Sequence, residues 1–152
     1  ENIVGPVRYL SKAHDCKYVF LDHLSIIVSA QENGDERKAI DEVMTRLRML
    51  TQETGIALFL VSHLRRPSGK GHEEGAATSL SDLRGSASIA QLSDIVLGFE
   101  RNGQAPLVED RNTTYIRVLK NRFSGETGLA ASLAYDQVTG RMSEITMDEE
   151  IL

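Results

Sequence analysis

Two short runs of apolar residues stand out along the chain because each ends near an ionisable residue. Residues 18–21 are followed by Asp22, and residues 56–61 are followed by Ser62 and His63. Continuous apolar runs of this length are typical of strands that are buried on both faces of a sheet. We therefore expect two fully buried strands.

Between these runs, the apolar residues repeat at the spacing of one helical face. Asp35 is a suitable N-cap for this helix, and Gly55 is a suitable stop. Glu42 and Arg46 lie four residues apart on the more polar side. A strand, a helix and a strand in this order form a βαβ unit with parallel strands and a right-handed crossover. The expected buried face of the helix contains Ile40, Val43, Met44, Leu47 and Leu50.

The last third of the chain changes from continuous apolar runs to alternation. Residues 114–123 and 129–135 alternate around a turn at 124–128, which predicts an antiparallel hairpin. A second turn at 139–140 leads into a short strand at 142–145. The predicted fold class is α/β, with a parallel sheet, helices on its faces and a C-terminal antiparallel hairpin.

The remaining segments give weaker patterns. Residues 7–13 predict a short helix, and the apolar run at 95–99 after Asp94 is a candidate to extend the parallel sheet. No regular structure is expected for residues 65–79 and 102–112.

Composition limits the class of protein. Of the 152 residues, 41% are hydrophobic and 26% are charged, which is typical of one ordinary globular domain. A net charge of −5 excludes a surface that is basic all round, although a local basic site fits. No apolar run approaches the roughly 18 residues of a membrane span. The single cysteine, Cys16, fits a reducing cytoplasm. Because the chain begins at Glu1 rather than Met, we expect a fragment.

The candidate chemistry begins where the two apolar runs end. The carboxyl ends of parallel strands meet at one edge of a sheet, so Asp22 and His63 are expected to share a site. Four apolar residues followed by Asp is the pattern of a Walker B strand, whose carboxylate helps to hold Mg²⁺ near phosphates. His63 is suited to sense a terminal phosphate by hydrogen bonding. The alternative is that each residue simply begins a loop.

Basic residues form two further candidate sites. The segment 65–79 combines glycines with three cations, which suits a phosphodiester chain, but Glu73 and Glu74 leave a solvated loop nearly as plausible. On the strand before the turn at 124–128, alternation places Lys120 and Arg122 on one face, as an anion site or a solvated edge. The three cations are Arg65, Arg66 and Lys70.

The order of short motifs along the chain resembles the helicase domain of phage primase-helicases of the gene-4 type, which belong with the bacterial DnaB-type helicase and mitochondrial Twinkle. The resemblance covers nearly the whole chain at similar spacing. The motifs are Leu21-Asp22-His23-Leu24-Ser25, Asp35-Glu36-Arg37-Lys38, Ser62-His63-Leu64, His72-Glu73-Glu74-Gly75, Asp82-Leu83-Arg84-Gly85-Ser86, Gln91-Leu92-Ser93-Asp94 and Lys120-Asn121-Arg122-Phe123-Ser124-Gly125.

The resemblance implies a RecA-like core that assembles into a hexameric ring and hydrolyses ATP or dTTP with Mg²⁺ while moving along single-stranded DNA. Asp22 would act on Mg²⁺ through water, and His63 would link the γ-phosphate to the following loop. Arg122 would be an arginine finger for the neighbouring subunit, with Lys120 beside it. The DNA-facing residues would be Arg65, Arg66, Lys70, Arg84, Gly85 and Ser86.

The chain departs from this family pattern in two ways. It contains no G-x-x-x-x-G-K-[ST] phosphate loop, and Gly69-Lys70-Gly71 has neither the spacing nor the hydroxyl. That loop, the strand before it and the catalytic glutamate are expected upstream of Glu1. The loop after His63 is also slightly shorter than in the phage pattern. Residues 1–147 are therefore interpreted as the C-terminal part of a RecA-like helicase domain and 148–152 as an acidic tail, and the isolated chain is expected to be inactive.

Two rival enzyme classes and an interaction module stay open at this point. A RecA-like recombinase shares the fold, although the Lys120 and Arg122 pair favours a helicase. A metal-dependent hydrolase could use Asp22, His23 and His63 together with His72. As an interaction module, the chain could recruit a replicative DNA polymerase through its acidic tail. Under the helicase interpretation, the expected partners are single-stranded DNA, further copies of the chain, a primase and that polymerase, and no membrane is expected. The expected location is the cytoplasm, which is that of the bacterial host for a phage protein.

Overall fold

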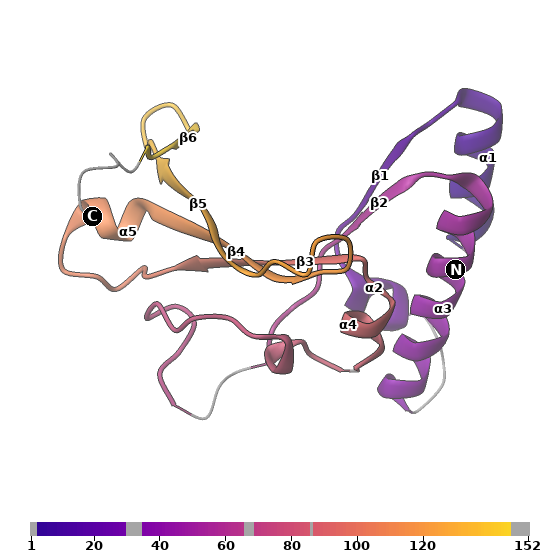
Figure 1. Ribbon diagram of the computed structural model, residues 1–152, viewed down its shortest axis with the longest axis horizontal. Coiled ribbons are helices and arrows are strands. Elements are labelled where there is room, and N and C mark those ends of the chain that lie inside the picture. The colour runs from indigo at the N-terminus through magenta and orange to yellow at the C-terminus, as the bar shows by residue number, and fades with distance from the viewer. Residues whose placement is uncertain (1–2, 30–34, 66–68, 86, 147–152) are drawn as a thin grey trace. The chain divides into compact units, whose positions relative to one another are not determined.

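A computed structural model describes residues 3–29, 35–65, 69–85 and 87–146 (Figure 1). The chain divides into two units. The first consists of residues 1–65 and 83–93, and the second consists of residues 66–82 and 94–152. Ser86, Arg66 and the acidic tail lie outside the described residues. Within the described part of the chain, no helix is both long and apolar enough to span a membrane.

The first unit contains the predicted βαβ arrangement. Its two strands pair in parallel, with Tyr18 opposite Ala57 and Leu21 opposite Leu60, which confirms that prediction. The helix α3 connects them and also contacts the three other helices of this unit. The elements of the unit are α1 (Val4–His14), β1 (Tyr18–Leu21), α2 (Leu24–Ser29), α3 (Glu36–Thr54), β2 (Ala57–Leu60) and α4 (Ser88–Leu92).

The helix α3 begins and ends as its sequence predicts. The Asp35 carboxylate accepts hydrogen bonds from the backbone amides of Arg37 and Lys38, which would otherwise lack partners in the first turn. Gly55 adopts a left-handed conformation, with φ of 71°, and its amide bonds to the Thr51 carbonyl. The predicted face is buried at Ile40, Val43, Met44, Leu47 and Leu50.

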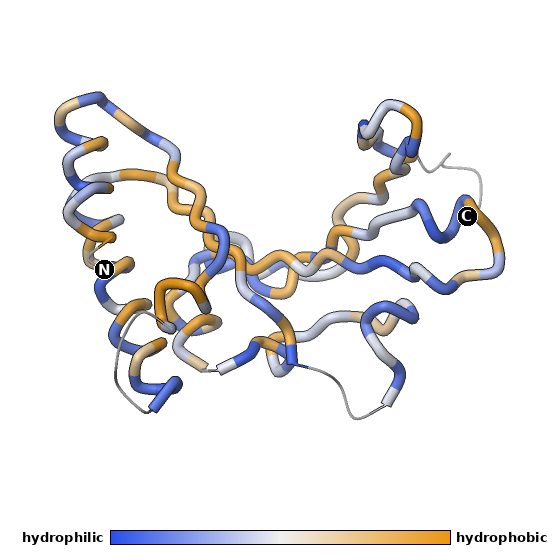
Figure 2. Tube along the Cα trace, turned by 180° about the vertical axis from the view of Figure 1, so that it is seen from behind, coloured by the Kyte–Doolittle hydropathy of each residue, from blue (hydrophilic) through white to orange (hydrophobic). Residues whose placement is uncertain are grey.

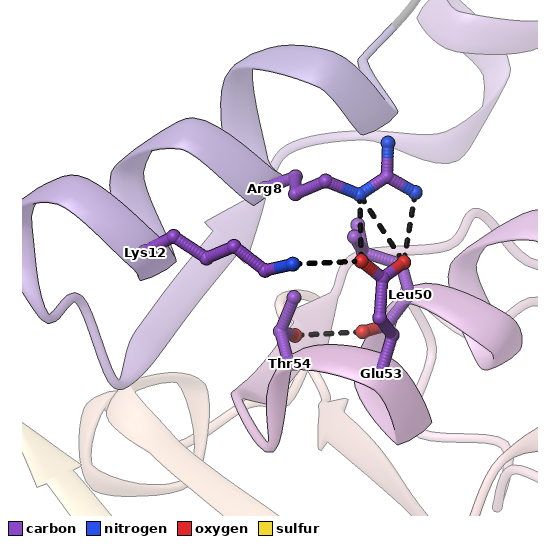
Figure 3. Close-up of polar contacts among 5 residues, drawn as sticks. All are labelled: Arg8, Lys12, Leu50, Glu53 and Thr54. Carbon is purple, nitrogen blue, oxygen red and sulfur yellow. Dashed lines mark hydrogen bonds and ion pairs between the residues drawn. The ribbon is translucent and has the colours of Figure 1, made fainter.

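Packing between α1 and α3 combines an apolar core with an ionic contact on the surface. The buried side chains of Val7, Leu50 and Ile56 pack together, with Val19 of β1 against them. Glu53 accepts hydrogen bonds from Arg8 at 2.8–3.1 Å and from Lys12 at 3.3 Å (Figure 3). This contact lowers the pKa of Glu53, chiefly through the hydrogen bonds from Arg8.

The expectation that both strands are fully buried is wrong. Apolar residues continue along both strands (Figure 2), but burial alternates, and the side chains of Tyr18, Phe20 and Phe59 are 68%, 73% and 48% exposed. The alternate residues are half-buried, and among them Val19 packs against Val7 of α1 and Leu50 of α3. Phe20 and Phe59 stack with ring centroids 4.5 Å apart on the uncovered face. A continuous apolar run indicates that a strand is suited to burial on both faces. It does not indicate that the described part of the chain covers both faces.

The second unit is a four-stranded antiparallel sheet in the order β3, β4, β5, β6. The predicted hairpin is confirmed as β4 and β5, and the predicted third strand is β6. Residues 102–112 were expected to lack structure but contain the short helix α5. The elements are the 3₁₀ helix η1 (Leu80–Asp82), β3 (Ile95–Arg101), α5 (Val108–Asn112), β4 (Thr113–Asn121), β5 (Gly128–Tyr135) and β6 (Met142–Glu144).

The run at 95–99 does not extend the parallel sheet. As β3 it pairs antiparallel with β4, from Ile95 opposite Asn121 to Arg101 opposite Thr114. The connection to β4, residues 102–112, contains a turn and the short helix α5, and it returns the chain directly alongside β3. A parallel neighbour would need a longer crossover. The apolar composition therefore indicated a strand but not its direction.

Candidate functional site

The carboxyl ends of β1 and β2 lie next to each other in the first unit. The Val61 amide donates to the Leu21 carbonyl at 2.9 Å, and the Leu24 amide donates to the Val61 carbonyl at 2.9 Å. Asp22 follows β1 directly and is exposed, and the peptide bond from Asp22 to His23 is cis. An exposed carboxylate at this edge can bind a hydrated cation.

Two histidine rings meet beside Asp22. The rings of His23 and His63 lie edge to face, with centroids 4.2 Å apart. His23 Nδ1 is buried and has no hydrogen-bond partner among the described residues. Sequence reasoning considered His23 only as a metal ligand, whereas its position after Asp22 could have indicated the contact with His63. This contact joins the segments that follow β1 and β2, and Asp22 directly precedes His23 in the first of them.

The turn at Arg84 and Gly85 is bonded to the same strand end. The Arg84 amide donates to the His63 carbonyl at 3.2 Å, and Leu64 forms an isolated antiparallel bridge with Leu83. The Arg84 side chain is exposed and lies 3.8 Å from Glu36. The structure thus places a basic side chain on the segment that pairs with His63.

Gly85 has a structural requirement that sequence reasoning did not foresee. Its φ of +103° is a conformation that side-chain-bearing residues rarely adopt, and a Cβ at this position would overlap the buried side chain of Ile40. Packing against α3 therefore explains this glycine without a contact to DNA.

The segment 65–79 has more structure than the sequence predicted. Arg65 and Lys70 are exposed. Backbone bonds from Glu74 to Gly71 and from Gly75 to His72, at 3.0 Å each, form a turn after Lys70. Beyond this turn the segment lies along the end of β3, because Glu74 forms a bridge with Asn102.

Lys120 and Arg122 lie near the exit of β4, although not on one strand face as expected. Lys120 pairs with Val96, but β4 ends at Asn121, so Arg122 is already in the turn. The Asn121 side chain favours the turn, because its Oδ1 accepts hydrogen bonds from the backbone amides of Phe123 and Ser124. Arg122 bonds to Asp94 twice, through its guanidinium at 3.0 Å and its amide at 2.9 Å.

A buried carboxylate in the second unit was missed by sequence reasoning. Glu100 of β3 is only 7% exposed and accepts hydrogen bonds from Thr78 and from Arg117. Burial raises the pKa of Glu100, but the hydrogen bonds from Arg117 and Thr78 outweigh it and hold the pKa below its ordinary value. The available signal was an acidic residue directly after the apolar run at 95–99.

The arrangement of the histidines gives little support to the metal-hydrolase alternative. Within the part of the chain that the structure describes, no three His, Cys, Asp or Glu side chains are grouped to hold a metal ion. His72 has two buried ring nitrogens without a hydrogen-bond partner among the described residues. It belongs to the second unit, whereas Asp22, His23 and His63 belong to the first.

Comparisons with known proteins agree on one family. Residues 1–144 match the DnaB-like helicase C terminal domain. The chain is 43% identical over 141 residues to the DNA helicase/primase of Enterobacteria phage T3, which covers 92% of this chain and 24% of the relative. It is 28% identical over 112 residues to the replicative DNA helicase DnaB of Treponema pallidum, covering 74% of this chain and 23% of that protein.

The fold comparison gives a consistent result. A solved structure of a DnaB-like replicative helicase, described together with its interactions with primase, superposes with a TM-score of 0.75 at 22% identity. The superposition covers 91% of this chain and 35% of that one. This likeness confirms the predicted α/β, RecA-like fold. The chain spans about a quarter of the length of the curated relatives described above. The family match favours the helicase interpretation over the recombinase and the hydrolase, and the chain belongs to the DnaB-like helicase C-terminal domain family.

Proposed function

We propose that this domain is part of a replicative helicase that couples nucleoside triphosphate hydrolysis to movement along single-stranded DNA and to duplex unwinding. One observation carries the proposal. The ends of β1 and β2 bring His23 and His63 to 4.2 Å beside the exposed Asp22, and the Arg84 segment bonds to the His63 carbonyl. Nucleotide-sensing and DNA-facing candidates therefore share one strand end.

The residues present fit one side of a nucleotide site. A single exposed carboxylate suits Mg²⁺, which keeps most of its water ligands and is commonly held by one or two carboxylates together with phosphate oxygens. Asp22 would hold the ion, which neutralises phosphate charge when bound. His63 would donate a hydrogen bond to the terminal phosphate. ATP or dTTP is the proposed nucleotide, and these 152 residues contain no G-x-x-x-x-G-K-[ST] motif to cradle its phosphates.

The opposite side of a nucleotide site is proposed to come from a neighbouring subunit. Arg122 would reach that subunit's nucleotide as an arginine finger, with Lys120 close by. The bonds from Arg122 to Asp94 support this role, because they hold the arginine at the strand exit while its side chain stays 43% exposed. A finger that acts on another chain requires a head-to-tail assembly, for which a hexameric ring is the proposed form.

Single-stranded DNA is the proposed track, and a primase is the proposed partner. Arg65, Lys70 and Arg84 are exposed cations on segments that follow His63 or bond to it. The T3 relative is a helicase/primase, and the solved neighbour is described with primase, which supports that partner. Arg66, Ser86 and the acidic tail proposed to recruit a polymerase lie outside the described residues.

The loop contact can be tested in a complete helicase that carries this domain. Replacing Arg65 and Lys70 by Ala should weaken single-strand binding to all sequences about equally. It should also lower the slope of log affinity against log salt by roughly 0.7 for each lost phosphate contact. Hydrolysis without DNA should persist. The matched control replaces Arg37 and Arg141, which are exposed cations outside the loop and give the same change in charge. Equal slopes for the two double variants would show that the loop does not contact DNA.

A further inference from the structure

We propose that Glu100 and Arg117 are positioning residues that hold residues 69–79 in place for DNA, an inference that rests on the proposed DNA-binding role of this loop. Glu100 Oε1 accepts hydrogen bonds from the Thr78 amide at 2.7 Å and from the Thr78 hydroxyl at 2.8 Å. Arg117 donates through Nε to Oε1 at 2.8 Å and through Nη2 to Oε2 at 3.1 Å. One carboxylate therefore joins the loop, β3 and β4.

The burial of Glu100 makes this connection specific. A charged carboxylate at 7% exposure is tolerated only where hydrogen bonds and an opposite charge replace water. Arg117 provides the charge, and Thr78 provides two further donors. If Thr78 moved away, the carboxylate would lose half of its protein hydrogen bonds in a site that water reaches poorly. The buried pair thus favours the docked loop over any other position of Thr78.

The loop is also fitted to the surface of β3 at Gly98. A Cβ on Gly98 would overlap the Thr78 hydroxyl, so the absence of a side chain there is what admits Thr78 to Glu100. Closer to Lys70 along the loop, Glu73 is also held, because its carbonyl accepts a hydrogen bond from the Gly103 amide at 3.0 Å. Lys70 lies just before this fixed stretch, so its position relative to the sheet depends on these contacts.

The same carboxylate connects the loop to β4, which contains Lys120 and leads into the turn that contains Arg122. Arg117 lies on β4, and Lys120 and Arg122 follow it by three and five residues. Within the second unit, Glu100 therefore bonds both to the loop and to β4, the strand that leads to Lys120 and the turn at Arg122. A DNA strand that displaces the loop would act on this sheet. We accordingly expect the Glu100 contacts to be needed for DNA to stimulate hydrolysis.

The test measures two quantities in the complete helicase: the ratio of hydrolysis rates with and without single-stranded DNA, and the DNA concentration that gives half-maximal stimulation. Neither depends on the fraction of active enzyme, so a loss of folded protein alone leaves both unchanged. Thr78→Val removes the hydroxyl donor at nearly constant volume. Because a hydrogen bond to a charged group contributes about tenfold or more to an equilibrium, we expect the half-maximal DNA concentration to rise by roughly tenfold. The stimulation ratio should fall.

Three further variants make the result specific. Thr78→Ser keeps both donors and should restore the behaviour of the original protein. Gly98→Ala should reproduce the Thr78→Val defect, because it excludes the hydroxyl while leaving Glu100 and Arg117 intact. Glu100→Gln keeps an acceptor for Thr78 but loses the charge facing Arg117, so its defect should be similar or larger. Hydrogen exchange of the amides at 71–78 should become faster in each defective variant.

The outcomes separate this inference from the proposed function. Suppose that Thr78→Val and Gly98→Ala leave both quantities unchanged while the Arg65 and Lys70 double variant weakens DNA binding. The loop then binds DNA without needing Glu100, and the positioning role is wrong. If the double variant is silent as well, the loop does not contact DNA, and both proposals are wrong. If Thr78→Val and Gly98→Ala raise the half-maximal DNA concentration and lower the stimulation ratio while Thr78→Ser is normal, the positioning role is supported.

Discussion

Gly85 shows how a residue expected at a DNA contact can be required by the fold instead. Gly85→Ala would have to adopt a φ of +103° and place its Cβ where the side chain of Ile40 lies. Left-handed backbone of this kind costs on the order of 1–3 kcal/mol for other residues, and a steric overlap adds to it. We expect the free energy of unfolding of this chain to fall by at least about 2 kcal/mol, as measured by urea denaturation.

A second glycine separates the two causes. Gly125 also has a positive φ, of +76°, but nothing lies within 4 Å of the position of its Cβ. Gly125→Ala should therefore show the backbone contribution alone and destabilise the chain less than Gly85→Ala. Equal losses for the two variants would mean that Ile40 moves aside without cost, which would weaken the packing explanation for Gly85.

At the scale of elements, the pairing of β3, β4 and the loop at Thr78 should respond to acid. The pKa of Glu100 lies below its ordinary value in the folded chain, so the unfolded chain binds a proton more readily. The stabilisation from Glu100 is therefore complete above the unfolded pKa of about 4.3 and is lost as the pH falls through the lower, folded pKa. Glu100→Gln cannot titrate. The difference in unfolding free energy between the original chain and this variant should shrink as the pH falls below about 4.3. Parallel curves from pH 7 to pH 3 would show that the carboxylate does not titrate in this way.

The elements also show which features of a sequence determine local structure. The helix α3 could be predicted closely because Asp35 and Gly55 act through local backbone bonds. The helices α2 and α5 were missed because six and five residues are too few to show a helical period. The direction of β3 and the uncovered face around Phe20 depend on which segments pack nearby, and that information is not local.

The candidate site divides in the same way. Asp22 and His63 could be identified because parallel strands bring their carboxyl ends together, whatever the side chains are. The contact of His23 with His63, the pairing of Arg122 with Asp94 and the burial of Glu100 each join residues distant in sequence. Such contacts need the register of strands, which a single sequence specifies only weakly.

At the scale of the whole molecule, the proposed finger makes each active site a product of two subunits. Arg122→Ala in a complete helicase should leave nucleotide binding largely intact and reduce hydrolysis severely, because a finger stabilises charge that develops in the transition state. In GTPases such a group contributes about 10³ to 10⁵ in rate. Lys120→Ala should have a milder effect. The measurement is steady-state hydrolysis beside nucleotide binding at equilibrium.

Mixing two inactive variants tests whether Arg122 acts on a neighbouring subunit. Subunits with Arg122→Ala keep Asp22, and subunits with Asp22→Asn keep Arg122. In a random equal mixture, about a quarter of head-to-tail interfaces pair an intact Asp22 with an intact Arg122 from the next subunit, because such interfaces join two different faces. Hydrolysis should then rise above that of either variant alone, and it should peak near equal proportions. A finger acting within its own chain leaves every subunit defective at every ratio, so a flat mixing curve in assembled rings would assign Arg122 to its own subunit's nucleotide.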